Sequence, residues 1–400
     1  MKKAYLHSTL HPCTENAMNL NLLKRWFGSN DWEVTKDATD ADFIVFSTCG
    51  FVESHEKYEL DRIKDIGDNK KDGAELVVLG CLPEIGQKKL ETVFNGRTVR
   101  TTSLETFDEI LPLPIKTTDF HNNLISEDEF DSDPHIHRYF KARKFFERLE
   151  WLPFVKVPRV FYTMPSERWW CVRTGMGCTG NCTFCAIKFA HGSQKSEPLS
   201  HIMDQVKRGV AEGRKEIALS GEDMGPYGID IKLDLADLLN EIVAVPGDFK
   251  VNLRFIDPYW LIRLQEKLWP AFESGKIKAF CAAAQAGSDR ILKKMARHYT
   301  FEELKKCVNT IVRETPVEMI STNIIVGFPT ETREECWESI RLIDEIDFLM
   351  YLVYPYEDRP HTKANDFEGK IDDAEKKYRR KVVNRHAVRK HARSFFLTRP

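Results

Sequence analysis

Short apolar runs alternate with helical segments along most of the 400-residue chain. This alternation is typical of a parallel α/β sheet, because helical crossovers join parallel strands. The longest series follows Trp169, where six strands are predicted at 169–174, 216–220, 251–256, 278–283, 319–326 and 348–353. Helices are predicted near 199–212, 233–243, 259–267, 289–296, 301–314 and 333–345. Six such units predict an open, partial (β/α)6 barrel, a shortened relative of the eightfold barrel.

A second α/β pattern precedes the barrel. Strands are expected within 3–11, 41–49 and 74–81, and helices at 16–27, 53–66 and 86–94. They predict a doubly wound parallel sheet domain at the N-terminus. We therefore divide the chain into four parts: an N-terminal domain at 1–110, a linker or insertion at 111–168, the barrel at 169–365, and a basic C-terminal helix at 366–400.

The N-terminal strands run into cysteines. Cys49 and Cys81 directly follow apolar strands, and Cys13 follows a weaker version of the same pattern. Ligands bind at the carboxyl ends of parallel strands, so all three cysteines would meet at one edge of the domain and allow a metal cluster there. The alternative is three unrelated buried cysteines, since unpaired cysteine is among the most buried residue types.

A second set of three cysteines follows the first barrel strand. Cys178, Cys182 and Cys185 have the spacing C-x3-C-x2-C. Cysteine thiolates are the usual ligands of iron–sulfur clusters, and three thiolates leave one iron of a four-iron cluster open to another molecule. The alternatives are a zinc loop or chance clustering. Zinc usually takes four ligands, and the nearby Cys171 and His191 have no usual zinc spacing.

The two sets together resemble the two-cluster, radical S-adenosylmethionine methylthiotransferase family, from about residue 3 to residue 364. The matching motifs, in chain order, are Cys13-Thr14-Glu15-Asn16, Ser47-Thr48-Cys49-Gly50-Phe51-Val52, Leu79-Gly80-Cys81-Leu82-Pro83, the 178–185 cysteine run, His191-Gly192-Ser193-Gln194-Lys195-Ser196, Leu219-Ser220-Gly221-Glu222-Asp223, Gln285-Ala286-Gly287-Ser288 and Ile325-Val326-Gly327-Phe328-Pro329. The sequence departs from the usual family residues at Pro12, Ser47, His191, Ala286 and Asn323.

The resemblance implies a radical-SAM barrel, two 4Fe-4S clusters and S-adenosyl-L-methionine. The radical SAM cluster would be held by Cys178, Cys182 and Cys185, and the auxiliary cluster by Cys13, Cys49 and Cys81. The expected cofactor-binding residues are Phe184, Gly221, Glu222, Gln285, Asn323, Val326 and Gly327. No catalytic residue is assigned beyond the clusters.

Within this set, Gly221 and Glu222 would meet the methionine amino group, because glycine allows a close backbone approach and a carboxylate pairs with an ammonium. Gln285 would contact the methionine carboxylate or the substrate, and Val326 with Gly327 would hold the adenine edge. For Gly221 and Glu222 the alternative is a strand-ending turn followed by a solvated acid. For Gln285 it is a plain polar loop residue, and for Val326 with Gly327 it is a turn without any ligand. Cys171, Cys281, Cys307 and Cys336 are expected in the core.

The implied activity is insertion of a methylthio group at an unactivated C–H carbon. One S-adenosylmethionine would donate a methyl group to sulfur at the auxiliary cluster, and a second would be cleaved to the radical that removes hydrogen. A flavodoxin or ferredoxin would supply electrons. The rival from another class is a non-catalytic iron–sulfur protein that delivers sulfur or electrons.

The substrate is expected to be a peptide or protein, such as a ribosomally made precursor peptide, with a tRNA adenosine as the alternative. Family branches that modify tRNA or ribosomal protein typically carry a small C-terminal β-barrel domain, whereas this sequence stops at Pro400 after the basic helix. Residues 111–168, with acidic 127–133 and basic, aromatic 138–148, would recognise the substrate or simply pack a helix. Nine Lys or Arg between Lys376 and Arg393 form a solvated face or meet an acidic peptide or phosphates.

Composition agrees with a cytoplasmic, monomeric enzyme. The net charge is −2, which gives no global attraction to nucleic acid or membrane, and no apolar run approaches the length of a bilayer span. Ten cysteines without a signal-peptide pattern at the start indicate metal or redox chemistry in place of disulfides.

Overall fold

The computed structural model describes residues 1–9, 13–50, 52–120, 123–125, 134–149, 151–152 and 166–396. The chain folds into two compact units. Unit 1 comprises Met1–Phe161, Pro165–Cys171 and Ala186–Gly192, and unit 2 comprises Tyr162–Met164, Val172–Cys185 and Ser193–Pro400. The segment expected as a separate linker therefore belongs mostly to unit 1, and the basic helix belongs to unit 2. The acidic stretch at 127–133 lies outside the described residues.

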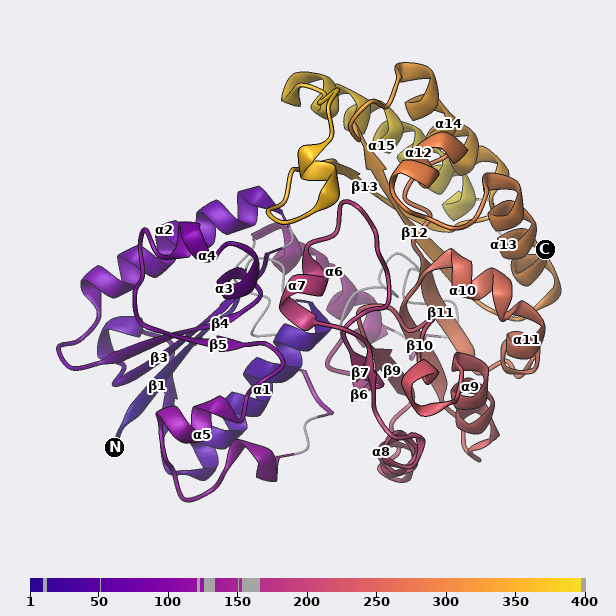
Figure 1. The fold of residues 1–400 in the computed structure, drawn as a ribbon. Coiled ribbons are helices and arrows are strands. Elements are labelled where there is room, and N and C mark those ends of the chain that lie inside the picture. The colour runs from indigo at the N-terminus through magenta and orange to yellow at the C-terminus, as the bar shows by residue number, and fades with distance from the viewer. Residues whose placement is uncertain are drawn as a thin grey trace. The chain divides into compact units, whose positions relative to one another are not determined.

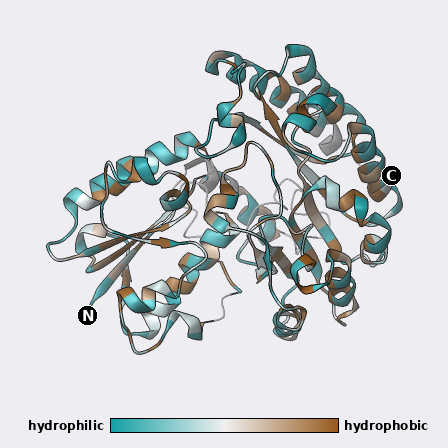
Figure 2. Ribbon diagram, viewed as in Figure 1, coloured by the Kyte–Doolittle hydropathy of each residue, from teal (hydrophilic) through white to brown (hydrophobic). Residues whose placement is uncertain are grey.

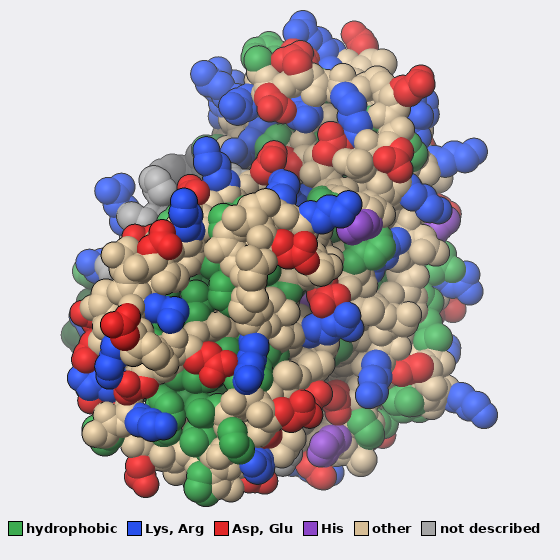
Figure 3. Space-filling view, turned by 60° about the vertical axis from the view of Figure 1, so that its left-hand side comes forward, with side chains coloured by type: hydrophobic (Ala, Val, Ile, Leu, Met, Phe, Trp, Pro, Cys, Tyr) green, Lys and Arg blue, Asp and Glu red, His purple; other side chains and the backbone are tan. Residues whose placement is uncertain are grey.

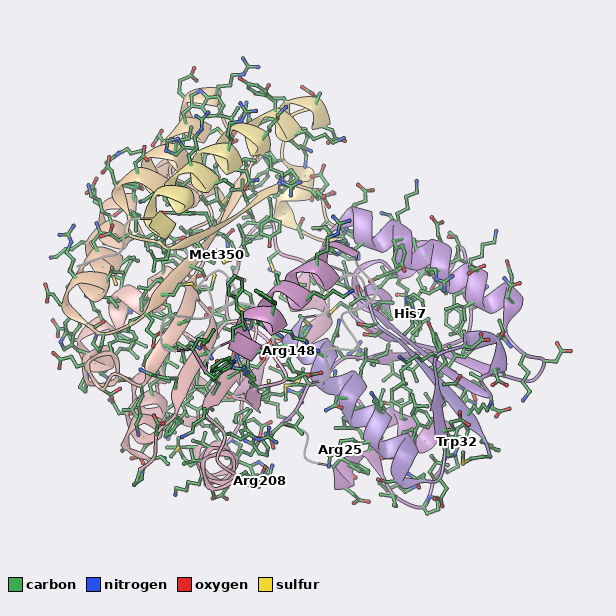
Figure 4. The ribbon with its side chains drawn as sticks, turned by 180° about the vertical axis from the view of Figure 1, so that it is seen from behind. His7, Arg25, Trp32, Arg148, Arg208 and Met350 are labelled. Carbon is green, nitrogen blue, oxygen red and sulfur yellow. The ribbon has the colours of Figure 1, made fainter. Side chains whose placement is uncertain are left out.

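Unit 1 is built on a five-stranded parallel sheet with the order β2-β1-β3-β4-β5 (Figure 1). Its strands are β1 (Lys3–His7), β2 (Glu33–Thr35), β3 (Phe43–Thr48), β4 (Glu75–Gly80) and β5 (Arg97–Arg100). The sequence predicted the three strands that precede cysteines but not the short outer strands β2 and β5. His7 ends β1, whereas Trp32 immediately precedes β2 at the opposite end of the sheet (Figure 4).

Helices cover both faces of this sheet. They are α1 (Thr14–Ser29), α2 (Glu53–Asn69), α3 (Leu82–Ile85), α4 (Gln87–Leu90) and α5 (Thr106–Ile110), with α6 (Pro134–Leu149) and α7 (Ile187–His191) in the same unit. Of the helix expected at 86–94, only Gln87–Leu90 forms α4, and a separate short helix, α3, ends just before it at Gly86. The aromatic, basic segment does form a helix, α6, on which Phe145 is 59% exposed.

Alternation along the strands sends side chains to two separate cores. Phe43, Val45, Val77 and Leu79 pack with Leu23, Trp26 and Phe27 of α1 and Phe107 of α5 on one face. Ile44, Phe46 and Val78 pack with Ile63 and Ile66 of α2 on the other. The central strands β3 and β4 are accordingly apolar over most of their length, and brown stretches mark apolar residues in Figure 2. Unit 1 is thus doubly wound, as the sequence predicted.

The second sheet is open and six-stranded, with the order β13-β12-β11-β10-β9-β6; five of its strands belong to unit 2, and β6 is divided between the units at Val172. The strands are β6 (Trp169–Arg173), β9 (Glu216–Ser220), β10 (Lys250–Ile256), β11 (Ile277–Ala282), β12 (Met319–Val326) and β13 (Met350–Pro355). The pairings from β9 to β13 are all parallel. A small hairpin pairs β7 (Gly175–Met176) with β8 (Lys195–Ser196). Six strands in sequential order confirm the partial (β/α)6 barrel.

The helices between these strands also agree with the sequence prediction. They are α8 (Leu199–Ala211), α9 (Leu235–Ala244), α10 (Pro258–Arg263), α11 (Gln265–Glu273), α12 (Asp289–Lys294), α13 (Phe301–Glu314), α14 (Arg333–Glu345) and α15 (Asp373–Phe396). Capping boxes start α9, α13 and α14, which explains why their N-termini were readable from the sequence. The helix expected at 259–267 is instead two helices, α10 and α11.

Acidic and basic side chains are interspersed on the face shown in Figure 3, in keeping with the small net charge. Within the described residues, no helix has both the length and the apolar content that a bilayer crossing requires.

Candidate functional site

The cysteines of unit 1 lie at the carboxyl edge of its sheet, after the adjacent strands β1, β3 and β4. The carbonyl oxygen of Thr48 draws their backbones together. It accepts hydrogen bonds from Asn16 Nδ2 at 3.3 Å and from the backbone N–H of Cys81 at 3.4 Å. Asn16 lies in the first turn of the helix that Cys13 caps, and Thr48 immediately precedes Cys49. One carbonyl thus links the three segments that carry the cysteines.

Close packing at this edge requires glycine at position 80. Gly80 has a φ of +123°, and a Cβ there would lie 2.3 Å from the Thr48 carbonyl oxygen. A substituent at this position would push β4 away from β3 just before Cys81. The glycine of the Leu-Gly-Cys motif is therefore explained by the close approach of two strands.

A buried carboxylate holds the Cys49 turn. Glu59 of α2 is fully buried, and its two oxygens accept the backbone N–H of Cys49 at 2.9 and 3.1 Å. One of them also accepts the hydroxyl of Thr9. Because Thr9 follows β1 and Cys49 follows β3, Glu59 fixes two strand ends at once.

The sulfur environments in unit 1 differ. Cys13 is exposed and caps α1, with its Sγ accepting from the Asn16 N–H at 3.4 Å. Cys49 is half-buried. Cys81 is buried, and its Sγ lies 3.2 Å from Nε2 of His191, whose helix α7 packs on α3 through Ala186 and Ala190. Three thiols at one sheet edge, one of them at a helix N-terminus, form a donor set that fits an iron–sulfur cluster.

The cysteine loop of unit 2 turns around Gly180. The Gly180 N–H donates to Cys178 Sγ at 3.1 Å, and a Cβ at Gly180 would lie 3.1 Å from that sulfur and 3.7 Å from Cys182 Sγ. Two sulfurs therefore face the same backbone position, and glycine keeps the space between them open. Among the described residues, no three His, Cys, Asp or Glu side chains surround a single-ion position. A cluster differs from such a site because its thiolates bind separate irons.

The same loop is anchored to the end of α12. Thr183 donates its N–H to the Met295 carbonyl at 3.1 Å and its hydroxyl to the Lys294 carbonyl at 2.8 Å. Two residues further, the buried Arg297 directs Nη1 to Cys182 Sγ at 3.3 Å and to an Asp257 oxygen at 2.9 Å. The end of α12 thus positions both the cysteine loop and a guanidinium beside it.

Two carboxylates complete this region. Asp257 follows β10 and caps α10, and its own backbone N–H donates to Asp223, which follows β9. Burial raises the pKa of Asp223 to about 6, with the Asp257 charge adding to the rise. Burial also raises the pKa of Cys178 to about 12, with Asp223 next in effect. Without metal Cys178 is therefore a thiol, and bound metal would deprotonate it.

The residues expected to bind S-adenosylmethionine lie at strand ends of unit 2. Gly221 and Glu222 follow β9, and a Cβ at Gly221 would approach Thr174 Oγ1 at 3.4 Å. Phe184, between Cys182 and Cys185, is half-buried. Their assigned contacts with the cofactor stay predictions.

Gln285 and Asn323 are brought side by side. The Gln285 N–H donates to the Asn323 carbonyl at 2.8 Å, and its carbonyl accepts from Ile325 at 2.7 Å. Gln285 has a φ of +66° and is only 8% exposed, and Asn323 Oδ1 is a buried oxygen without a hydrogen-bond partner among the described residues. A strained backbone beside an unsatisfied amide is the arrangement expected where a polar ligand binds.

Val326 and Gly327 are more fully engaged by the protein. The Val326 carbonyl accepts from Tyr356, the Gly327 N–H donates to Glu331 at 2.6 Å, and a Cβ on Gly327 would clash with Lys376 of α15 at 2.6 Å. Their contact with the adenine edge stays a prediction. The remaining cysteines, Cys171, Cys281, Cys307 and Cys336, are at most 5% exposed, which confirms them as core residues.

The sequence analysis did not single out Glu59, Asp257 or Arg297, and it quoted Asp223 and Thr183 only within motifs. Arg297 and Asp257 carry no local pattern, because Arg297 lies 115 positions from its partner Cys182 and Asp257 meets the site through Arg297, also far away in sequence. The available signal for Glu59 was a carboxylate on the apolar stripe of a helix, four residues before Ile63 of the core.

Sequence comparisons agree with this geometry. A profile described as the radical SAM superfamily matches residues 172–343, and one described as uncharacterized protein family UPF0004 matches residues 5–99. The chain is 30% identical over 364 residues to the ribosomal protein uS12 methylthiotransferase RimO of Thermotoga sp. (strain RQ2), covering 90% of this chain and 78% of the relative. It is 28% identical over 365 residues to a probable threonylcarbamoyladenosine tRNA methylthiotransferase of Pyrococcus horikoshii, covering 91% and 79%.

Similar solved structures share the fold. The radical S-adenosylmethionine methyltransferase TsrM from Kitasatospora setae matches with a TM-score of 0.60 at 14% identity, covering 91% of this chain and 75% of that one. The cobalamin-dependent radical enzyme OxsB matches with a TM-score of 0.52 at 12% identity, covering 91% and 55%. At these identities the likeness concerns architecture alone.

Proposed function

Because this chain belongs to the radical S-adenosylmethionine methylthiotransferase family, we propose that it inserts a methylthio group at an unactivated C–H carbon of a peptide or protein acceptor. The observation that carries the reaction is the pair of cysteine triads, one at the carboxyl ends of parallel strands in unit 1 and the other in the loop that follows β6 and β7 in unit 2. Members of the family use S-adenosylmethionine and 4Fe-4S clusters, of the two-cluster type.

Each triad has a proposed task. Cys178, Cys182 and Cys185 would hold the cluster that meets S-adenosylmethionine, and Cys13, Cys49 and Cys81 would hold the auxiliary cluster. When bound, these groups supply the electron, the radical, the methyl group and the sulfur. The protein orients the sulfur ligands: Glu59 holds the Cys49 turn, Thr183 anchors the downstream loop, and Gly180 keeps space between two sulfurs.

A protein acceptor is supported by the uS12 methylthiotransferase, which is 30% identical across most of this chain. A protein acceptor is also supported by the basic helix α15, because several of its basic side chains already form ion pairs or hydrogen bonds within unit 2. Arg379 pairs with Glu331 and Glu375, Arg380 donates to the Val353 carbonyl, and Lys390 donates to carbonyls at the end of α14. These side chains are engaged within the protein and are less available for phosphates.

A tRNA adenosine is the second candidate, and the outer face of the same helix favours it. Lys377, Lys381, Arg385 and Arg389 are exposed, and no described acidic side chain pairs with them. An exposed row of cations fits a phosphate backbone. The tRNA methylthiotransferase names of several relatives point the same way.

Mass spectrometry of bulk tRNA and of candidate peptides after anaerobic turnover distinguishes the two. We expect one methylthio group on a peptide or protein. A quadruple variant with glutamine at 377, 381, 385 and 389 should leave that product unchanged. Methylthiolated adenosine without any modified peptide, lost in the quadruple variant, would contradict the proposed acceptor while leaving the reaction standing.

A further inference from the structure

The buried guanidinium of Arg297 contacts Cys182, one of the three cysteines of unit 2 that would hold the radical SAM cluster. The Arg297 side chain is 6% exposed, and its Nη1 lies 3.3 Å from Cys182 Sγ and 2.9 Å from the Asp257 carboxylate. Nη2 donates to the Ala283 carbonyl at 2.9 Å, and Nε lies 3.4 Å from the Tyr299 hydroxyl. Every nitrogen of the guanidinium thus has a partner, and one of these partners is a sulfur.

Local structure fixes this contact. After α12 the backbone turns through Ala296, which has a φ of +57°, and the Arg297 N–H returns to the Leu292 carbonyl at 2.9 Å. The Met295 and Lys294 carbonyls at the same helix end hold Thr183, the residue after Cys182. The C-terminus of α12 therefore holds both the cysteine loop and Arg297, which fixes the position of the guanidinium relative to Cys182.

The strength of this hydrogen bond depends on the charge of the accepting sulfur. A buried cation costs several kcal/mol unless it is paired, and Asp257 supplies the pairing. A thiol sulfur is a weak acceptor, whereas an N–H bond to a charged acceptor is roughly twice as strong as a neutral one. The hydrogen bond from Arg297 is therefore strongest to a sulfur that carries charge as an iron ligand.

We propose that Arg297 is a positioning residue for the cluster of Cys178, Cys182 and Cys185, and that its hydrogen bond to the Cys182 sulfur favours the reduced cluster. Hydrogen bonds to cluster sulfurs and the net charge nearby set reduction potentials. Asp257 works in the opposite direction, because its carboxylate offsets the guanidinium charge. The inference rests on the cluster assignment of the proposed function.

The test isolates one cluster. In a background with Cys13, Cys49 and Cys81 changed to Ala, only the downstream cluster remains, and its reduced fraction is read by electron paramagnetic resonance at set potentials. For R297Q we expect about a tenfold lower ratio of reduced to oxidised cluster, which is about 59 mV for one electron. D257N should shift the ratio the other way, because it removes the offsetting charge.

Controls separate this role from a structural one. Arg290 lies on α12 and pairs with Glu335 at the surface, so R290Q should match the parent. R297K keeps the charge but loses the planar fork, so its shift should be smaller than that of R297Q. If R297Q retains no iron, R297K alone decides: a lower ratio supports the proposal, and a parental ratio overturns it.

Two further outcomes are distinct. Parental ratios in both R297Q and D257N would overturn the role of Arg297 and leave the cluster assignment intact. A background protein that binds no iron at all would overturn the cluster assignment, and with it the proposed function.

Discussion

At the scale of single residues, the site depends on buried side chains that touch the cysteines without being cysteines. Glu59, Thr183 and Arg297 come from elements distant in sequence, and each fixes the backbone or the sulfur of one cysteine. Cysteine spacing predicted where sulfur gathers. It could not predict these supports, because a contact between Glu59 and Cys49 depends on how α2 crosses the sheet.

Glu59 gives a residue-scale prediction. E59Q keeps the shape of the side chain, but its amide NH2 then faces one of the groups, the Cys49 N–H or the Thr9 hydroxyl, that donate to the carboxylate. An unsatisfied buried group of this kind costs about 1–3 kcal/mol. We expect urea unfolding of the metal-free protein to show a loss of that size, and reconstituted protein to lose iron from the auxiliary cluster.

The matched control is E53Q on the same helix, where the Glu53 side chain is 69% exposed. Its stability and iron content should equal those of the wild type. An E59Q protein as stable as E53Q, with full iron, would show that the buried carboxylate does not hold the Cys49 turn.

At the scale of elements, α15 shows where charge patterns mislead. Its nine basic residues predicted a solvated face or a phosphate-binding surface. The helix instead packs its inner side on unit 2, where Val383 and Ala387 are buried and Arg379 donates to the Glu331 carboxylate at 2.8 Å. Glu331 lies 48 positions earlier, so counting charges along the helix cannot reveal which cations face inward.

Strands and capped helices were far more predictable, because their signals are local. Five of the six strands of unit 2 begin within one residue of the predicted start, and β13 begins two residues later. The errors lie where local signals are weak: the two-residue hairpin β7–β8, the short strands β2 and β5, and the breaks at Gly86 and Leu264.

The burial of Glu331 predicts that the stability of the protein depends on pH. Burial raises the pKa of Glu331 from 4.5 to about 7, although Gly327 and Arg379 oppose the rise. Below pH 4.5 the carboxyl is protonated whether the chain is folded or not. Between pH 4.5 and 7 the unfolded chain ionises first, so the stability contributed by this group is lost as pH rises, by at most about 3 kcal/mol.

E331Q should therefore flatten the stability profile. The free energy of unfolding of the wild type, relative to E331Q, should fall between pH 4.5 and 7 in urea titrations of the metal-free protein. E334Q is the control, since the neighbouring Glu334 carboxylate is on the surface and its pKa is lowered, so the wild type and E334Q should run parallel in this window. Parallel profiles for the wild type and E331Q would refute the burial effect.

At the scale of the whole molecule, each compact unit carries one cysteine triad, and each triad has one proposed task. Unit 1 carries Cys13, Cys49 and Cys81, and unit 2 carries Cys178, Cys182 and Cys185. The two triads share no ligand, so either can be removed while the other stays. With two 4Fe-4S clusters the chain should bind about eight irons, and each triple alanine variant about half.

The most direct measurement is one mass-spectrometric assay, run anaerobically on the wild type and both triple alanine variants, that quantifies 5′-deoxyadenosine and methylthiolated acceptor together. We expect both products from the wild type and neither from the variant lacking Cys178, Cys182 and Cys185. The variant lacking Cys13, Cys49 and Cys81 should form 5′-deoxyadenosine without any methylthiolated acceptor. Methylthiolated product from that last variant would contradict the assignment of sulfur insertion to the triad of unit 1.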